Sequence, residues 1–205
     1  MITKAGVELL YRVSTLTKKP GEYNGRVFLI AFEKPIKWLG NATAVLTSTD
    51  GHMAAFIPTK TDREEFGVLA TYVITKDMLS ELSENDEAAG NRLKKLVESK
   101  IDDELPETRL SNHGALNISA ANALYKNGYL TVLAPGENFY TERGYLHGSS
   151  DEIMRDEIVL DPRYYNIATR FFGKAVVNVR RYEVGMIMFS TGHAAVVIME
   201  MVKQR

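Results

Sequence analysis

The chain has 205 residues, with 25 Lys and Arg against 26 Asp and Glu, 45% hydrophobic residues and no cysteine. This length supports a sizeable hydrophobic core, and the composition excludes disordered and collagen-like chains. The lack of cysteine excludes a disulfide scaffold, a thiol nucleophile, a zinc ribbon and an iron–sulfur site.

The first part of the chain is predicted to be rich in strands. Residues 7–15 alternate partly and carry β-forming side chains, and residues 26–32 form a short apolar run. Asp50-Gly51 is a pair that favours tight hairpin turns. Strands are therefore expected over residues 7–15, 26–32, 43–49, 52–57 and 66–75.

The middle of the chain is predicted to contain two helices. Apolar residues recur at helical spacing between positions 85 and 103, Ser83 and Asp86 resemble a capping box, and Pro106 ends the helix. A shorter helix is expected over residues 117–126. Strands are expected over residues 129–133 and 138–141, followed by a polar loop over 144–161 with a short helix at 151–155.

Asp161-Pro162 predicts the start of a third helix, because Asp is a preferred N-cap and Pro suits the first helical position. This helix is expected to end at Gly173, and residues 175–182, 184–189 and 194–202 read as three strands. The sequence thus predicts an α+β fold: a mostly antiparallel sheet, two or three helices, and a C-terminal three-stranded antiparallel segment in the core.

The length predicts a single domain over residues 1–205, with a weak composition boundary near 106–113. Charge is uneven along the chain. Residues 76–162 carry 9 basic and 17 acidic side chains, whereas residues 163–205 carry 7 basic and 2 acidic ones. This asymmetry suggests an acidic and a basic face that pair between copies of the chain or with another protein.

No segment predicts membrane insertion or secretion. The uncharged run over residues 184–199 is 16 residues long, shorter than the roughly 20 apolar residues that a spanning helix needs. Charged residues interrupt the first ten positions, which therefore do not resemble a signal peptide. We expect a protein of the cytoplasm, or one assembled into a particle from it.

Motifs of common catalytic sites are absent from the sequence: no phosphate-binding glycine loop, no nucleophile elbow and no metal-binding helix. Each of the four histidines has a glycine neighbour, but no two share a metal-ligand spacing. No metal and no cofactor is therefore expected, and an enzyme is not the favoured interpretation.

One fragment keeps an enzymatic alternative open. Tyr145-Leu146-His147-Gly148-Ser149-Ser150 resembles the first motif of one class of ADP-ribosyltransferases, in which the His and Ser hold the nicotinamide ribose. The resemblance implies a late catalytic Glu, and Glu200 stands in that order, although the spacing does not match. His147-Gly148-Ser149 also fits half of a two-histidine phosphodiesterase. The alternative is an enzyme acting on a nucleotide or phosphoester through His147 and Ser149.

The favoured interpretation is a non-enzymatic structural subunit of a symmetric homo-oligomer, such as a virion neck or tail ring component. Its candidate interface combines basic side chains with methionines that adapt to irregular partners. These residues are Arg163, Arg170, Arg180, Arg181, Met186 and Met188. Partners are then copies of the chain or another protein. Nucleic acid is not expected, since no run of Lys and Arg exceeds two residues.

Overall fold

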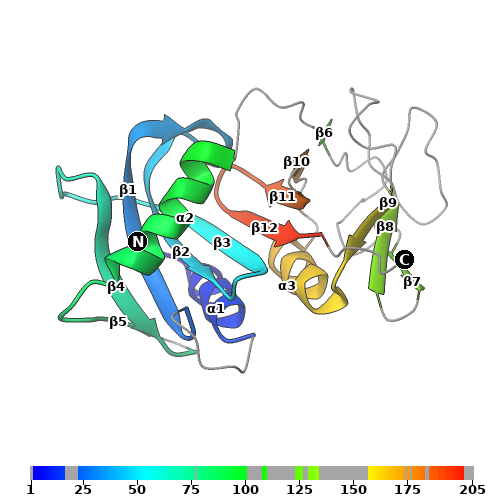
Figure 1. Ribbon diagram of the computed structural model, residues 1–205, viewed down its shortest axis with the longest axis horizontal. Coiled ribbons are helices and arrows are strands. Elements are labelled where there is room, and N and C mark those ends of the chain that lie inside the picture. Colours follow the sequence, from blue (N-terminus) through cyan, green and yellow to red (C-terminus); the bar gives the residue numbers. More distant parts are fainter. Residues whose placement is uncertain are drawn as a thin grey trace. The chain divides into compact units, whose positions relative to one another are not determined.

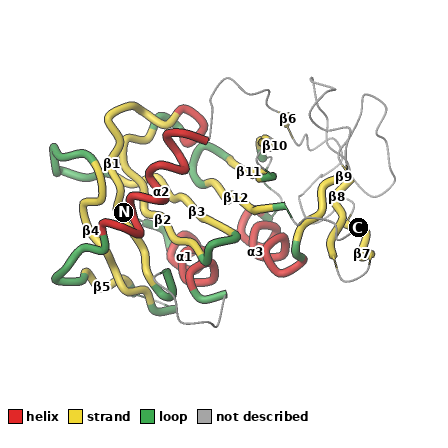
Figure 2. Tube along the Cα trace, in the orientation of Figure 1, coloured by secondary structure: helices red, strands yellow, loops and turns green. Residues whose placement is uncertain are grey.

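A computed structural model describes residues 2–16, 23–76, 78–100, 108–109, 123–126, 129–133, 157–173, 175, 177–182 and 185–200. The described residues form three α-helices and two antiparallel sheets (Figure 1), and Figure 2 shows the strands in yellow and the helices in red. The predicted α+β class is therefore confirmed. The chain divides into two compact units, residues 1–103 with 192–196 and residues 104–191 with 197–205. The single domain expected from length stays a prediction.

Unit 1 begins with helix α1 (Lys4–Ser14), where a strand was expected. The prediction was wrong because the buried residues Leu9, Leu10 and Val13 follow helical spacing, and adjacent buried positions do not fit a half-buried strand. Thr3 caps the helix, since its hydroxyl accepts a hydrogen bond from the amide of Gly6 at 3.1 Å.

The sheet of unit 1 has the strand order β5-β4-β1-β2-β3. Its strands are β1 (Arg26–Ile36), β2 (Ala42–Thr49), β3 (Met53–Thr59), β4 (Gly67–Ile74) and β5 (Leu79–Glu81). The expected hairpin is confirmed: β2 pairs with β3 around Asp50-Gly51. The strands expected near residues 26–32 and 66–75 are confirmed as β1 and β4.

The two helices of unit 1 cover opposite faces of this sheet. The hydroxyl of Ser48 donates to the carbonyl of Leu10 at 3.0 Å, which places α1 on the Ser48 face. Helix α2 (Glu87–Lys100) packs instead on Phe28, the strand partner of Thr47. Neighbouring strand residues point to opposite faces of a sheet. Ser48 therefore points to the face that α1 covers, and Thr47 points to the face that α2 covers. Both faces of the central strands are accordingly buried.

Helix α2 begins after Asp86, whose carboxylate accepts the amide of Ala89 at 3.2 Å. Asp86 also forms an ion pair with Arg26 of β1, and its own amide donates to Thr71 at 3.0 Å. The helix near residues 85–103 is thus confirmed as far as Lys100. Its cap is Asp86 alone rather than a capping box from Ser83, and residues 101–103 lie outside the described residues.

The short 3₁₀ helix η1 (Lys37–Leu39) connects β1 to β2. Its Trp38 makes an edge-to-face contact with Phe56, with ring centroids 5.9 Å apart. Gly40 follows in the left-handed conformation at φ +67°. The backbone there passes so close to Gly192 that a Cβ atom has no room, which explains the glycine.

Unit 2 contains helix α3 and most of the remaining strands. The elements are β6 (Thr108–Arg109), β7 (Ala123–Lys126), β8 (Tyr129–Leu133), β9 (Glu157–Leu160), α3 (Pro162–Phe172), β10 (Asn178–Tyr182), β11 (Met186–Ser190) and β12 (Ala195–Met199). One sheet has the order β7-β8-β9, and the order β12-β11-β10-β6 follows in the other. Of β12, residues 195–196 are counted with unit 1 and residues 197–199 with unit 2.

Several predictions in this part are confirmed. Helix α3 begins after Asp161 and ends at Gly173, and β8 occupies residues 129–133. The C-terminal three-stranded segment is present as β10, β11 and β12, and the residues of β11 are all buried.

Two predictions in unit 2 were wrong. Residues 123–126 form strand β7, because they pair with β8 instead of continuing a helix. Residues 157–160 form β9, which pairs with the other edge of β8, where a loop was expected. The expected elements at 117–122, 138–141 and 151–155 lie outside the described residues.

Candidate functional site

The three helices concentrate positive charge in a chain of nearly balanced composition. Together they carry eight Lys and Arg residues and three Glu residues. The rest of the chain holds the remaining 17 basic and 23 acidic side chains. The described helices are therefore basic, whereas the rest of the sequence is acidic.

Helix α3 shows this charge most clearly. Its exposed residues are Arg163, Asn166 and Arg170, which recur at helical spacing and form a single solvent-facing stripe. The opposite side is apolar and buried, including Tyr165, whose ring meets Phe189 edge to face at 6.3 Å. Burial raises the pKa of the Tyr165 phenol above its ordinary value. The α3 stripe, as we name these three residues, holds two cations, an amide and no acid.

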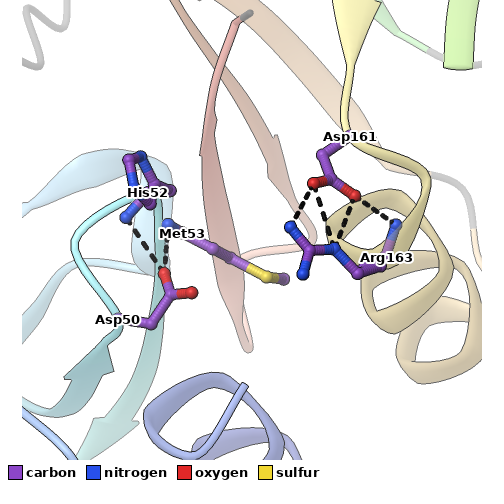
Figure 3. A network of polar contacts seen from close by, with 5 residues as sticks. All are labelled: Asp50, His52, Met53, Asp161 and Arg163. Atoms are coloured by element: carbon purple, nitrogen blue, oxygen red, sulfur yellow. Dashed lines mark hydrogen bonds and ion pairs between the residues drawn. The ribbon is translucent and has the colours of Figure 1, made fainter. Parts of the chain in front are cut away.

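Arg163 of the α3 stripe is fixed by the residue that caps its helix (Figure 3). The carboxylate of Asp161 accepts the backbone amide of Arg163 at 2.8 Å. It also accepts the guanidinium, from Nε at 3.1 Å and from Nη2 at 2.6 Å. The Asp161 side chain is 12% exposed, whereas that of Arg163 is 66% exposed. The arginine thus faces solvent while a nearly buried carboxylate balances its charge.

The helices of unit 1 repeat this pairing of cation and carboxylate. On α1, Arg12 donates from Nη2 to Glu8 at 2.7 Å, and this hydrogen bond together with the arginine charge lowers the pKa of Glu8. On α2, Lys94 forms an ion pair with Glu98 at 3.0 Å. Each pair spans one helical turn, where side chains four residues apart meet.

Further exposed cations lie beside these pairs. Lys4 of α1 and Arg92 and Lys95 of α2 are exposed. The guanidinium carbon of Arg92 lies 5.8 Å from the centre of the Tyr23 ring, within cation–π range. Lys and Arg side chains on helices, together with amides such as Asn166, are the groups that bind phosphate oxygens in nucleic-acid complexes.

The turn that contains His52 shows hydrogen bonds of a structural kind. Asp50 uses Oδ1 to accept the backbone amides of His52 at 3.0 Å and Met53 at 2.9 Å, as Figure 3 shows. This is the hydrogen bonding of an Asx turn, and it holds the hairpin between β2 and β3. Among the described residues no group of three or more His, Asp or Glu side chains is placed to hold a metal ion.

The predicted site residues are placed as follows. His147 and Ser149 lie outside the described residues. Glu200 is described, and its backbone amide donates a hydrogen bond to the carbonyl of Gly185 at 2.7 Å. Arg163 and Arg170 share the exposed stripe of α3.

The other candidate residues lie on β10 and β11. Arg180 pairs with Met188 and Arg181 with Ile187 in the strand register. Met186 and Met188 are 4% and 0% exposed, so both methionines fill the interior of this structure. Sequence reasoning missed Asn166, Arg92 and Lys95, although each follows the helical period of its segment.

No protein-family model matches the chain, and no curated protein matches it in sequence. The fold, however, is shared with solved sliding-clamp subunits of bacterial DNA polymerase III. Subunit beta from Borrelia burgdorferi, in complex with a natural product, matches with a TM-score of 0.55 and 14% identity, covering 98% of this chain and 62% of that one.

Two further clamp structures share this fold. The DNA polymerase sliding clamp of Caulobacter crescentus gives a TM-score of 0.52 at 10% identity, and subunit beta from Pseudomonas aeruginosa gives 0.52 at 11%. Each match covers 98% of this chain and 64% or 63% of the clamp subunit, so the chain spans less than two thirds of these proteins.

This likeness corrects three sequence-based expectations. The interpretation as a virion neck or tail ring component was wrong, because the similar folds are those of replication proteins. The alternative of a nucleotide or phosphoester enzyme using His147 and Ser149 is overturned by the same finding. The expectation that nucleic acid is not a partner also loses its support, since the similar structures are DNA polymerase clamps. The described residues include no helix long and apolar enough to span a membrane.

Proposed function

We propose that this chain is a sliding-clamp subunit that holds duplex DNA for a DNA polymerase in the cytoplasm. The observation that carries the proposal is the match of 98% of the chain to a clamp subunit at a TM-score of 0.55. The absence of catalytic sequence motifs agrees with a role in holding DNA rather than modifying it.

The basic helices supply the second line of support. The α3 stripe presents Arg163, Asn166 and Arg170 without an acidic residue between them. Cations on a helix attract the phosphate backbone and release its counterions, which requires no particular base sequence. A protein that moves along DNA needs this kind of contact.

We also propose that the chain associates with further copies of itself. Strand β5 ends the described strand order of unit 1, and an edge strand offers backbone groups for pairing with another chain. Val73 on the neighbouring strand and Met78 beside β5 are 40% and 59% exposed. Light scattering should give a mass that is a multiple of 23.0 kDa. A monomer at every concentration would contradict self-association.

The DNA contact is tested by anisotropy of a labelled 30-bp duplex across a salt series. Binding should weaken steeply as salt rises, because each phosphate contact contributes about 0.9 to the slope of log affinity against log salt. Arg170→Gln should weaken binding and lower that slope. Lys60→Gln, an equal loss of charge at an exposed site outside the helices, should change binding less. Salt-independent binding, or equal effects of the two variants, would contradict the proposal.

Sliding is tested with a duplex whose two ends are blocked by bound streptavidin. A protein that slides leaves an open duplex at its ends, so blocking should prolong the bound lifetime. A protein that only binds and dissociates in place should show the same lifetime on both duplexes. That second result would leave a DNA-binding protein without a clamp function.

A further inference from the structure

Each of the three described α-helices has a cation paired with a nearby carboxylate. The pairs are Arg12 with Glu8, Lys94 with Glu98, and Arg163 with Asp161, at nitrogen-to-oxygen distances of 2.7, 3.0 and 2.6 Å. A helix surface evolved only to maximise affinity for phosphate has no use for these acids. A carboxylate placed against a cation of each of these helices requires an explanation.

Asp161 is the clearest case, because it need not be acidic to cap its helix. Asn is an equally good N-cap, since its side-chain oxygen accepts the same backbone amide. The acid in this position adds a full negative charge against the guanidinium of Arg163, through Nε and Nη2. The cap and the charge are thus separate contributions of one side chain.

We propose that Asp161 attenuates the hold of the α3 stripe on duplex DNA by partly neutralising Arg163. The inference rests on the proposed function. Asp161 itself is nearly buried and does not reach solvent as Arg163 does, so it acts through the arginine. A phosphate approaching Arg163 meets an ion pair instead of an unbalanced cation, and this contact adds less affinity and less salt dependence.

The other two pairs extend the same argument to unit 1. Glu8 and Glu98 each lie beside a helix cation and leave fewer unbalanced charges for phosphates. Since α1 and α2 cover opposite faces of one sheet, one straight duplex contacts only one of these helices at a time. Attenuation in unit 1 is therefore expected from one of the two carboxylates, not from both.

The test compares duplex binding by wild type, Asp161→Asn, Arg163→Gln and the double variant across a salt series. Because the Arg163 side chain is exposed to solvent, its ion pair with Asp161 is weak, so Asp161→Asn should tighten binding by about two- to fivefold. The slope should be steeper by up to about 0.9 as Arg163 engages a phosphate. The double variant should bind no more tightly than Arg163→Gln, because the acid acts only through that arginine.

A matched control separates attenuation from a change in net charge. Glu64→Gln removes one exposed carboxylate outside the helices and should tighten binding much less than Asp161→Asn. Unchanged or weaker binding by Asp161→Asn overturns attenuation, as does equal tightening by Glu64→Gln. A different result would contradict the proposed function itself: wild type would show no salt-dependent binding of duplex DNA, and Arg170→Gln would leave the affinity unchanged. Thermal unfolding of each variant confirms that the fold is intact.

Discussion

The carbonyl oxygen of Gly192 lies 2.6 Å from the position that a Cβ atom would take on Gly40. The two glycines are 152 positions apart in sequence, and both belong to unit 1. A side chain at Gly40 would therefore strike backbone, which cannot rotate away as a flexible side chain can.

Gly40→Ala should lower the free energy of unfolding by more than the about 1–2 kcal/mol that left-handed backbone costs a residue with a Cβ. Urea unfolding measures the loss. Gly25→Ala is the matched control, since Gly25 has φ +66° but its nearest neighbouring atom is 4.0 Å away. Equal losses in the two variants would show that the approach of Gly192 is unimportant.

Gly90 lies inside α2 and faces Val68. Alanine is favoured over glycine in a helix by about 1 kcal/mol. The added Cβ, however, would lie 2.6 and 2.8 Å from the two methyl carbons of Val68, and overpacking costs about 1–3 kcal/mol. Because valine is stiff at χ1, Gly90→Ala should destabilise the protein. In a Val68→Ala background the same change should stabilise it, as a double-mutant cycle in urea can establish.

Thr47 and Ser48 are adjacent and buried but differ in hydrogen bonding. The Thr47 hydroxyl has no hydrogen-bond partner among the described residues, whereas Ser48 bonds the Leu10 carbonyl. Thr47→Val should leave stability unchanged or raise it by about 1 kcal/mol, because an unpaired buried hydroxyl is unfavourable. Ser48→Ala should lower stability by about 1 kcal/mol. A strong loss from Thr47→Val would indicate a bound water at that hydroxyl.

Tyr72 is sensitive to alkaline pH. Burial raises the pKa of its phenol, and the negative charge of Glu81 raises it further. A raised folded-state pKa gives stability that is fully present below the unfolded value near 10 and is lost as pH rises through the folded value. Glu81→Gln should lower the Tyr72 pKa, measured as absorbance at 295 nm against a Tyr72→Phe reference. An unchanged titration would assign the whole shift to burial.

The strands were easier to predict than the first helix. Asp50-Gly51 identified its hairpin because the turn depends on two residues alone. Residues 7–15 misled because Val7, Val13 and Thr15 favour strands locally, while the burial of Leu9 and Leu10 depends on packing against β2 and β3. Tertiary contacts of this kind are not visible in a short window.

The candidate site was predictable only in part. Arg163 and Arg170 stood out because basic residues dominate the end of the chain. The ion pair with Asp161 could not be predicted, since the Asp-Pro pair indicates where the helix begins but not how the Arg163 side chain is oriented. Met186 and Met188 were taken for an interface because their spacing on a strand shows a shared face but not which faces are covered.

Unfolding should follow a single transition, in keeping with the single domain predicted from length. Strand β12 is divided between the units at residues 196 and 197, so neither unit can lose it alone. Calorimetry should give equal calorimetric and van't Hoff enthalpies. Two resolved transitions would instead establish two domains.

The division of unit 1 also bears on synthesis at the ribosome. Its larger segment ends at residue 103, but residues 192–196 complete it. A growing chain therefore carries the first 103 residues through the time needed to add the next 88, roughly 4–18 s at 5–20 residues per second. During that interval the first unit lacks its last strand segment, so the apolar surface that this segment covers stays exposed until residues 192–196 emerge.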